Sequence, residues 1–168
     1  YTALLVKVVA ICLIKNPRLN ASLENEAILC YQQANIGVAM DTPLGLLVPV
    51  IHQAESLDIN EIQQILNNLR QQANEGKINA EHLSGGTFTI SNLGMYGIDR
   101  FHAIINPPEA AVLAVGRIRD LPWVNKQEVV VCPIMTLRLS IDHRILDGAT
   151  AAPFLNDVRD YLENPQKI

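Results

Sequence analysis

The last third of the chain places ionisable residues between two apolar elements, and this feature most constrains the fold. A strand expected over 129–141 and a helix expected over 148–162 enclose the run Asp142-His143-Arg144-Ile145-Leu146-Asp147. Charged groups are costly at such a place unless they pair with one another or perform chemistry. We therefore expect a layered structure in which a strand end and a helix start hold these groups.

The remaining segments predict helices and short strands in mixed order. Asp58 and Glu61 have the spacing of a capping box, and Pro49 places its strand at a sheet edge or a bulge. Pro153 fits the last helix if that helix begins near Thr150. Helices are expected over 2–15, 58–74 and 148–162, and strands over 27–31, 35–41, 44–51, 87–91, 110–117 and 129–141. This order predicts an α/β fold, with a mixed β-sheet layered with helices in one domain over residues 1–168.

Composition argues against several classes of function. The 168 residues are 49% hydrophobic, which suffices for one core, and the net charge of −4 without a basic run argues against nucleic acid and anionic membrane partners. No apolar run approaches the roughly 20 residues that span a bilayer. Cys12, Cys30 and Cys132 lack metal-ligand spacing, so we interpret them as small buried residues in a reducing compartment and expect no metal site.

His143 and Asp147 admit an ordinary and a functional interpretation. In the ordinary one, His143 is a buried, hydrogen-bonded histidine and Asp147 is the N-cap of the last helix. In the functional one, His143 is a general base held at a strand end, since the pKa of a histidine, about 6.5, is close to working pH. Arg144 and the neighbouring aspartates would then neutralise one another and leave the imidazole basic.

Six segments together resemble one enzyme family. The run Asp142–Gly148 resembles the D-H-R-x-x-D-G signature of the dihydrolipoamide acyltransferases, the core (E2) components of 2-oxoacid dehydrogenase complexes. Five further segments resemble the same family in the same order, at 15–21, 35–39, 45–51, 87–97 and 103–110. The resemblance extends from the first expected helix to the last.

The resemblance implies a chloramphenicol-acetyltransferase-like fold with its active site at trimer interfaces. The implied reaction transfers an acyl group between lipoyl-lysine and coenzyme A, with His143 as the base that takes the thiol proton. Because a free thiol has a pKa of about 8.5, complete transfer to a histidine costs roughly 2.7 kcal/mol. Ser91 would donate a hydrogen bond to the oxyanion, although its local sequence also fits a residue that caps a turn. Asp147 would orient the site.

The resemblance also implies substrates, partners and location. Coenzyme A is a substrate, and lipoyl-lysine belongs to a separate domain. Homotrimers would assemble into a large core that receives E1 and E3 components through upstream domains. We expect lipoyl and subunit-binding domains upstream, and a catalytic domain that is incomplete at its N-terminal end. The setting would be bacterial cytoplasm or the mitochondrial matrix, and the loop at 91–97 is most like the acetyl-transferring members.

Two alternatives stay open. A catalytically silent scaffold subunit would build the core without transferring acyl groups, but such a subunit would be expected to lose His143. Chloramphenicol acetyltransferases and peptide-synthetase condensation domains have a related H-H-x-x-x-D-G motif with another acceptor. Asp142 before the histidine and Arg144 after it favour the dihydrolipoamide branch.

Overall fold

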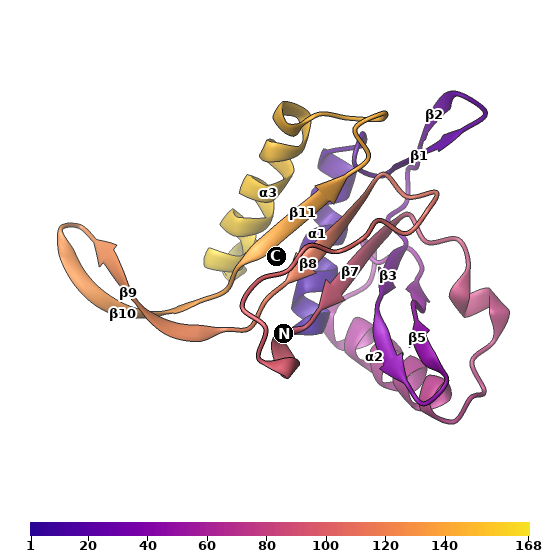
Figure 1. Cartoon of the computed structure of the whole chain (residues 1–168), viewed down its shortest axis with the longest axis horizontal. Helices are drawn as coiled ribbons and strands as arrows, with labels where there is room; N and C mark the ends of the chain where they lie inside the picture. Colours follow the sequence, from indigo (N-terminus) through magenta and orange to yellow (C-terminus); the bar gives the residue numbers. More distant parts are fainter.

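A computed structural model describes residues 1–168, and its centre is a five-stranded sheet of strand order β11-β8-β7-β3-β6 (Figure 1). The inner strands β3, β7 and β8 are parallel, and the edge strands β6 and β11 run antiparallel to their neighbours. The strand bounds are β3 Ile36–Val38, β6 Val50–Ile51, β7 Phe88–Asn92, β8 Ala111–Val115 and β11 Leu137–Ile141. This arrangement confirms the predicted mixed sheet.

Three helices cover one face of the sheet (Figure 1). They are α1 (Thr2–Lys15), α2 (Ile59–Asn74) and α3 (Gly148–Glu163). Helix α1 packs against both of the others, so it is apolar on most of its surface and most of its residues are buried. Its predicted bounds are confirmed. No helix is both long and apolar enough to span a membrane.

The hydrophobic core lies between this helical layer and the sheet. Phe88, Ile90 and Leu113 point from the sheet into the core and are fully buried. The Phe88 ring packs on Phe154 of α3, with the two ring centroids 5.5 Å apart. Burying each such side chain stabilises the fold by roughly 1.5–3 kcal/mol. The core therefore fixes which face of β7 is turned away from the helices.

Helix α2 has the predicted capping box. The Asp58 carboxylate accepts hydrogen bonds from the backbone N–H groups of Asn60 and Glu61, and the Glu61 carboxylate accepts one from the Asp58 N–H at 2.7 Å. The apolar side chains of Ile62, Leu66 and Leu69 are buried on one side of the helix, whereas Ile59 in the first turn is 37% exposed. Local chemistry alone thus sets the start of this helix.

Helix α3 begins at Gly148, as predicted from the sequence. Pro153 therefore lies inside the helix and cannot donate to the carbonyl of Ala149. Asp147 caps the helix directly before Gly148, so the start near Thr150 that Pro153 was expected to require is wrong. The buried side chains of Phe154 and Val158 hold the segment helical beyond the proline.

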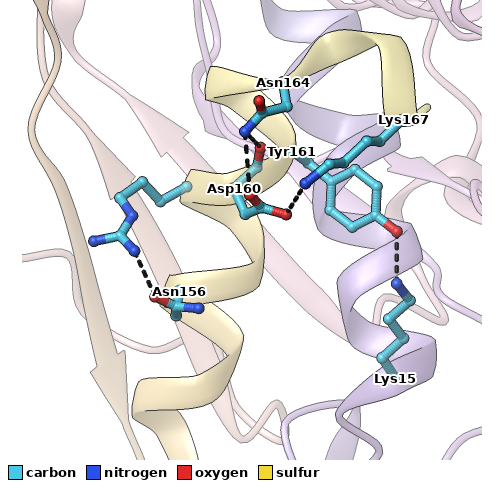
Figure 2. Close-up of polar contacts among 7 residues, drawn as sticks. Lys15, Asn156, Asp160, Tyr161, Asn164 and Lys167 are labelled. Carbon is cyan, nitrogen blue, oxygen red and sulfur yellow. Dashed lines mark hydrogen bonds and ion pairs between the residues drawn. The ribbon is translucent and has the colours of Figure 1, made fainter.

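The end of α3 is tied to α1 and to the last residues of the chain (Figure 2). The Lys15 ammonium donates to the Tyr161 hydroxyl at 2.6 Å, which joins the last turns of α1 and α3. The Lys167 ammonium lies 2.7 Å from the Asp160 carboxylate. These contacts are largely exposed, so each contributes little to stability. They fix where the chain end lies against α3.

Three hairpins project from the sheet. They are β1 (Ala21–Glu24) with β2 (Ala27–Cys30), β4 (Met40–Thr42) with β5 (Gly45–Leu47), and β9 (Arg119–Asn125) with β10 (Glu128–Ile134). Both turn residues of the first and third hairpins have positive φ, as tight two-residue turns require. The β9–β10 hairpin extends far beyond the sheet (Figure 1). Short 3₁₀ turns are η1 (Ala80–Leu83), η2 (Gly94–Tyr96) and η3 (Pro165–Lys167).

Three of the expected strands are divided in the structure. The long strand expected over 129–141 is wrong, because Met135 and Thr136 separate β10, which pairs with β9, from β11, which pairs with β8. The segments 35–41 and 44–51 each contribute one strand to the sheet and one to the β4–β5 hairpin. Strand β6, directly after Pro49, lies at the sheet edge, as predicted. Strands β1 and β9 were not predicted.

The three cysteines are free thiols in different surroundings. Cys12 is buried in α1, where burial raises its pKa to about 12, so it is a packing residue and not a nucleophile. Cys132 is half-buried. Cys30 is exposed at the end of β2, so the expectation of a buried side chain is wrong there.

Candidate active site

Strand β7 presents Ser91 on the face of the sheet opposite the helices. Phe88 and Ile90 point into the core, so Thr89 and Ser91 point the other way, because side chains alternate along a strand. Ser91 is half-buried, and its hydroxyl makes no hydrogen bond within the chain. The core therefore positions this hydroxyl rigidly and leaves it available to a ligand.

Ser91 lines a cavity of about 430 Å³. The cavity is mostly apolar, and its only charged lining residues are Asp41 and Arg70. Its volume lies in the range of small-molecule sites. Among the other lining residues are Val38, Met40, Leu46, Leu93 and Met95.

A polar contact joins two walls of this cavity. The Tyr96 hydroxyl in η2 donates to the Asp41 carboxylate in β4 at 3.3 Å, and the Asp41 charge raises the pKa of Tyr96. Neither residue was singled out from the sequence. No local pattern identifies them, because the two residues are 55 positions apart and only the β4–β5 hairpin brings them together.

The turn after β11 carries His143 and is held by Asp142. The Asp142 N–H donates to the Ala110 carbonyl at 2.8 Å, and its carboxylate receives the Arg144 guanidinium through two nitrogens. Arg144 keeps the pKa of Asp142 below its usual range, so the pair stays ionised near neutral pH. This confirms that Arg144 neutralises an aspartate beside the histidine.

His143 is exposed and makes no hydrogen bond within the chain. The interpretation of a buried, hydrogen-bonded histidine is therefore wrong. His143 and Arg144 are followed directly by Ile145 and Leu146, which are buried and anchor the turn. The imidazole is thus presented to the outside from a well-held backbone.

Asp147 is the N-cap of α3, as the ordinary interpretation predicted. Its Oδ1 accepts from the Thr150 N–H and the Thr150 hydroxyl, both at 2.8 Å. These two bonds lower the pKa of Asp147, and the neighbouring His143 lowers it further by a smaller amount. Asp147 therefore stays ionised near His143 while it caps the helix.

The strand register separates Ser91 from His143 within one chain. Ser91 is level with Ala114 of β8, whereas Ile141, two residues before His143, is level with Ala111. With 3.3 Å per residue along a strand and 4.8 Å between strands, Ser91 and Ile141 lie about 14 Å apart. In Figure 1, β11 points toward the loop before α3 and β7 points toward the other end of the sheet. The two predicted catalytic residues do not meet in one chain.

No group of three or more His, Cys, Asp or Glu side chains is placed to hold a metal ion. Of the other histidines, His102 contacts Arg138 on β11. His52 and His102 are exposed and His82 is half-exposed, in agreement with their interpretation as surface or turn residues.

The same fold occurs in a known acetyltransferase. Chloramphenicol acetyltransferase superposes with a TM-score of 0.56 at 14% identity, over 96% of this chain and 77% of that one, and so shares the fold. The model of the family "2-oxoacid dehydrogenases acyltransferase (catalytic domain)" matches residues 1–168. The chain belongs to this family.

Several relatives cover almost the whole chain. The acetyltransferase component of the Staphylococcus epidermidis pyruvate dehydrogenase complex is 42% identical over 97% of the chain. The Bacillus subtilis component of an acetoin cleaving system is 40% identical over 91%, and the Pseudomonas aeruginosa succinyltransferase component of the 2-oxoglutarate dehydrogenase complex is 38% identical over 100%. The chain spans only 38% to 41% of the length of these relatives.

Solved structures agree closely with this fold. Azotobacter vinelandii dihydrolipoamide acetyltransferase superposes with a TM-score of 0.96 at 34% identity, over 99% of this chain and 69% of that one. A serine, a histidine and an asparagine have been investigated for their role in the catalytic mechanism of that enzyme. The cubic core of a pyruvate dehydrogenase multienzyme complex superposes with a TM-score of 0.95 at 34% identity, over 99% and 69%.

Proposed function

We propose that this chain catalyses transfer of an acyl group between lipoyl-lysine and coenzyme A, in the core of a 2-oxoacid dehydrogenase complex. The observation that carries the proposal is the exposed His143 imidazole, on a turn fixed by the Asp142–Arg144 pair. Such an imidazole is free to take a proton from an incoming thiol.

Residue spacing supports the same roles. In the Azotobacter vinelandii enzyme, the named histidine follows the named serine by 52 residues and the asparagine follows four residues later. His143 follows Ser91 by 52 residues, and Asp147 follows His143 by four. We therefore assign the base to His143, the oxyanion donor to Ser91 and an orienting role to Asp147. The aspartate in place of asparagine keeps a hydrogen-bonding side chain at this position.

The proposed reaction uses the His143 imidazole and the Ser91 hydroxyl. His143 takes the thiol proton as the sulfur attacks the thioester carbonyl, and the carbonyl oxygen becomes negatively charged. The Ser91 hydroxyl donates a hydrogen bond to that oxygen, and one such donor contributes about 10²–10³ in rate. When the intermediate collapses, the second thiolate leaves and receives the proton from His143. The same path run backwards transfers the acyl group in the other direction.

The proposed active unit is a homotrimer, because one chain cannot bring Ser91 to His143. A neighbouring subunit would supply the missing partner at each interface. The β9–β10 hairpin supports an oligomer, since its apolar side chains Val124, Val129 and Val131 are 68%, 72% and 75% exposed in the single chain. The likeness to the cubic core supports further assembly of trimers into a large particle.

Acetyl is the proposed acyl group. Several similar relatives are acetyltransferase components, although the Pseudomonas aeruginosa relative is a succinyltransferase component. The Ser91 cavity is mostly apolar, and its two charged lining residues, Asp41 and Arg70, have opposite charges, which suits an uncharged acyl group better than a carboxylate-bearing one. We propose that E1 and E3 components bind through other domains, in bacterial cytoplasm or the mitochondrial matrix, where thiol substrates stay reduced.

The test is a steady-state assay of the full-length protein with dihydrolipoamide and acetyl-, succinyl- or isobutyryl-CoA. We expect the highest kcat/KM with acetyl-CoA. A higher value with succinyl-CoA would overturn the choice of acyl group but not the reaction. Acetylation of chloramphenicol in place of dihydrolipoamide would support the alternative acceptor, and no transfer to any thiol would support a scaffold subunit.

A further inference from the structure

Glu109 is a buried carboxyl group that the proposed reaction does not use. It is 4% exposed and lies between the turn Asn106–Pro108 and β8. Its Oε1 accepts hydrogen bonds from the Thr89 hydroxyl at 2.9 Å and from the Asn106 amide at 3.4 Å, while its Oε2 is buried without a partner. Desolvation raises its pKa to about 7, so keeping a carboxyl here is costly. The free-energy cost of burying the Glu109 carboxyl indicates that this side chain has a function.

Two glycines make room for the contact between Glu109 and Thr89. A Cβ at Gly86 would lie 3.1 Å from the Glu109 Oε1, and a Cβ at Gly37 would lie 3.0 Å from the Thr89 hydroxyl and 2.8 Å from a Val48 methyl. Any other residue at Gly37 would force Thr89 or Val48 to move. The carboxyl–hydroxyl pair therefore occupies a tightly fitted space and not a loose surface position.

The side chain of Glu109 acts on the strand that carries the serine. Thr89 precedes Ser91 by two residues on β7, so both side chains lie on the same face of the sheet. Core packing holds β7 from the helix side through Phe88 and Ile90. The Glu109 bond to Thr89 holds the strand from the other side, two residues from the serine.

The backbone next to Glu109 acts on the turn that carries the histidine. The carbonyl of Ala110 accepts the Asp142 N–H at 2.8 Å, one residue before His143. The Ala110 N–H donates to Ala21 at 2.9 Å, and the Glu109 N–H donates to Asn106 at 3.0 Å. One short segment thus contacts the elements that carry both proposed catalytic residues.

We propose that Glu109 is a positioning residue of the acyltransferase, which fixes the serine strand through its side chain and the histidine turn through the adjoining backbone. This inference rests on the proposed function. In a trimer, the serine strand of one chain and the histidine turn of the next would form each active site. Loss of Glu109 from every chain therefore disturbs both the serine and the histidine of every site. Misplacement of reacting groups by about 1 Å costs up to about 10²-fold in rate.

The experiment compares four variants in the full-length protein. Glu109→Leu removes both accepted bonds, Thr89→Val removes the main donor with little change of shape, and Glu109→Gln keeps an acceptor oxygen for Thr89. Lys7→Met is the matched control. The Lys7 ammonium donates to the backbone carbonyls of Glu55 and Leu57, which belong neither to β7 nor to the turn that carries His143. For each variant, kcat and both KM values are measured with acetyl-CoA and dihydrolipoamide, well below the unfolding temperature.

We expect Glu109→Leu and Thr89→Val to lower kcat about 10- to 100-fold while both KM values change less than about threefold. Glu109→Gln should stay within about twofold of the wild type, and Lys7→Met should lower only thermal stability. Unchanged kcat in Thr89→Val, even if Glu109→Leu does not fold, would overturn the proposal. So would a loss in Glu109→Gln as large as that in Glu109→Leu. An inactive wild type would refute the proposed function instead.

Discussion

At the scale of single residues, the site depends on which charged groups are already paired. Asp142 is neutralised by Arg144, and Asp147 is held by Thr150, so neither carboxylate needs the imidazole as a partner. His143 remains exposed and free of hydrogen bonds beside them. This arrangement suits a residue that must accept a proton from a substrate.

Replacing His143 should abolish transfer without changing assembly. Because a positioned general base contributes about 10²–10⁴ in rate, we expect kcat of His143→Ala to fall by that factor. Particle size, measured by sedimentation, should stay the same, since the exposed side chain makes no hydrogen bond within the chain. His82→Ala on η1 is the matched control and should keep full activity. Survival of activity in His143→Ala would support another base or the scaffold alternative.

Glu109 should make stability depend on pH. In the unfolded chain its carboxyl ionises near pH 4.5, whereas burial raises its pKa to about 7 in the folded chain. The wild type therefore loses stability relative to Glu109→Gln as pH rises from about 4.5 to 7. From denaturant unfolding, we expect the free energy of unfolding of the variant to exceed that of the wild type by about 2 to 3 kcal/mol more at pH 8 than at pH 5. A difference that does not vary with pH would contradict the buried-acid interpretation.

At the scale of elements, the sequence predicts those helix ends that are set by residues nearby in the chain. Helix α2 starts at its capping box, and Asn16-Pro17 ends α1. Strand β9 was missed because Pro122 lies within it, and the break between β10 and β11 carries no glycine or proline. Pairing partners, not local sequence, divide that segment, since β10 pairs with β9 and β11 pairs with β8.

The β9–β10 hairpin should contribute to subunit association. Val129 and Val131 point to the same side of β10, and both are largely exposed in the single chain. Val129→Thr with Val131→Thr keeps the strand propensity but adds two hydroxyl groups to this face. If a neighbouring subunit covers the face, the trimer should dissociate at a protein concentration at least about tenfold higher, because burying a hydroxyl without a partner costs 1–3 kcal/mol. Sedimentation equilibrium measures this shift, and wild-type association would contradict it.

At the scale of the whole molecule, strand order decides that one chain cannot form a complete site. The serine and histidine lie at opposite ends of the sheet because β11 runs antiparallel to β8 while β7 runs parallel to it. Any active site that uses both side chains must therefore combine two chains. This conclusion depends on topology and not on any local contact.

Mixed assemblies of two inactive variants should recover activity. Ser91→Ala and His143→Ala chains are unfolded together at equal amounts and refolded. If each site combines the serine of one chain with the histidine of the next, roughly a quarter of the sites in random trimers are intact. We expect about that fraction of wild-type activity, whereas each variant refolded alone should stay inactive. No recovery in well-formed mixed trimers would show that the two residues do not share a site across chains.

The sequence by itself predicted the candidate catalytic residues and placed many of the local elements. Short motifs predict the roles of His143, Asp147 and Ser91, and residue spacing and caps predict the helices of the core. Each of these signals is formed by residues that are close together in the sequence. Only the tertiary structure decided that His143 is exposed, that Ser91 opens into a cavity, and that Glu109 is buried against Thr89. These properties depend on which distant strands pair and in which direction, and no local pattern records that choice.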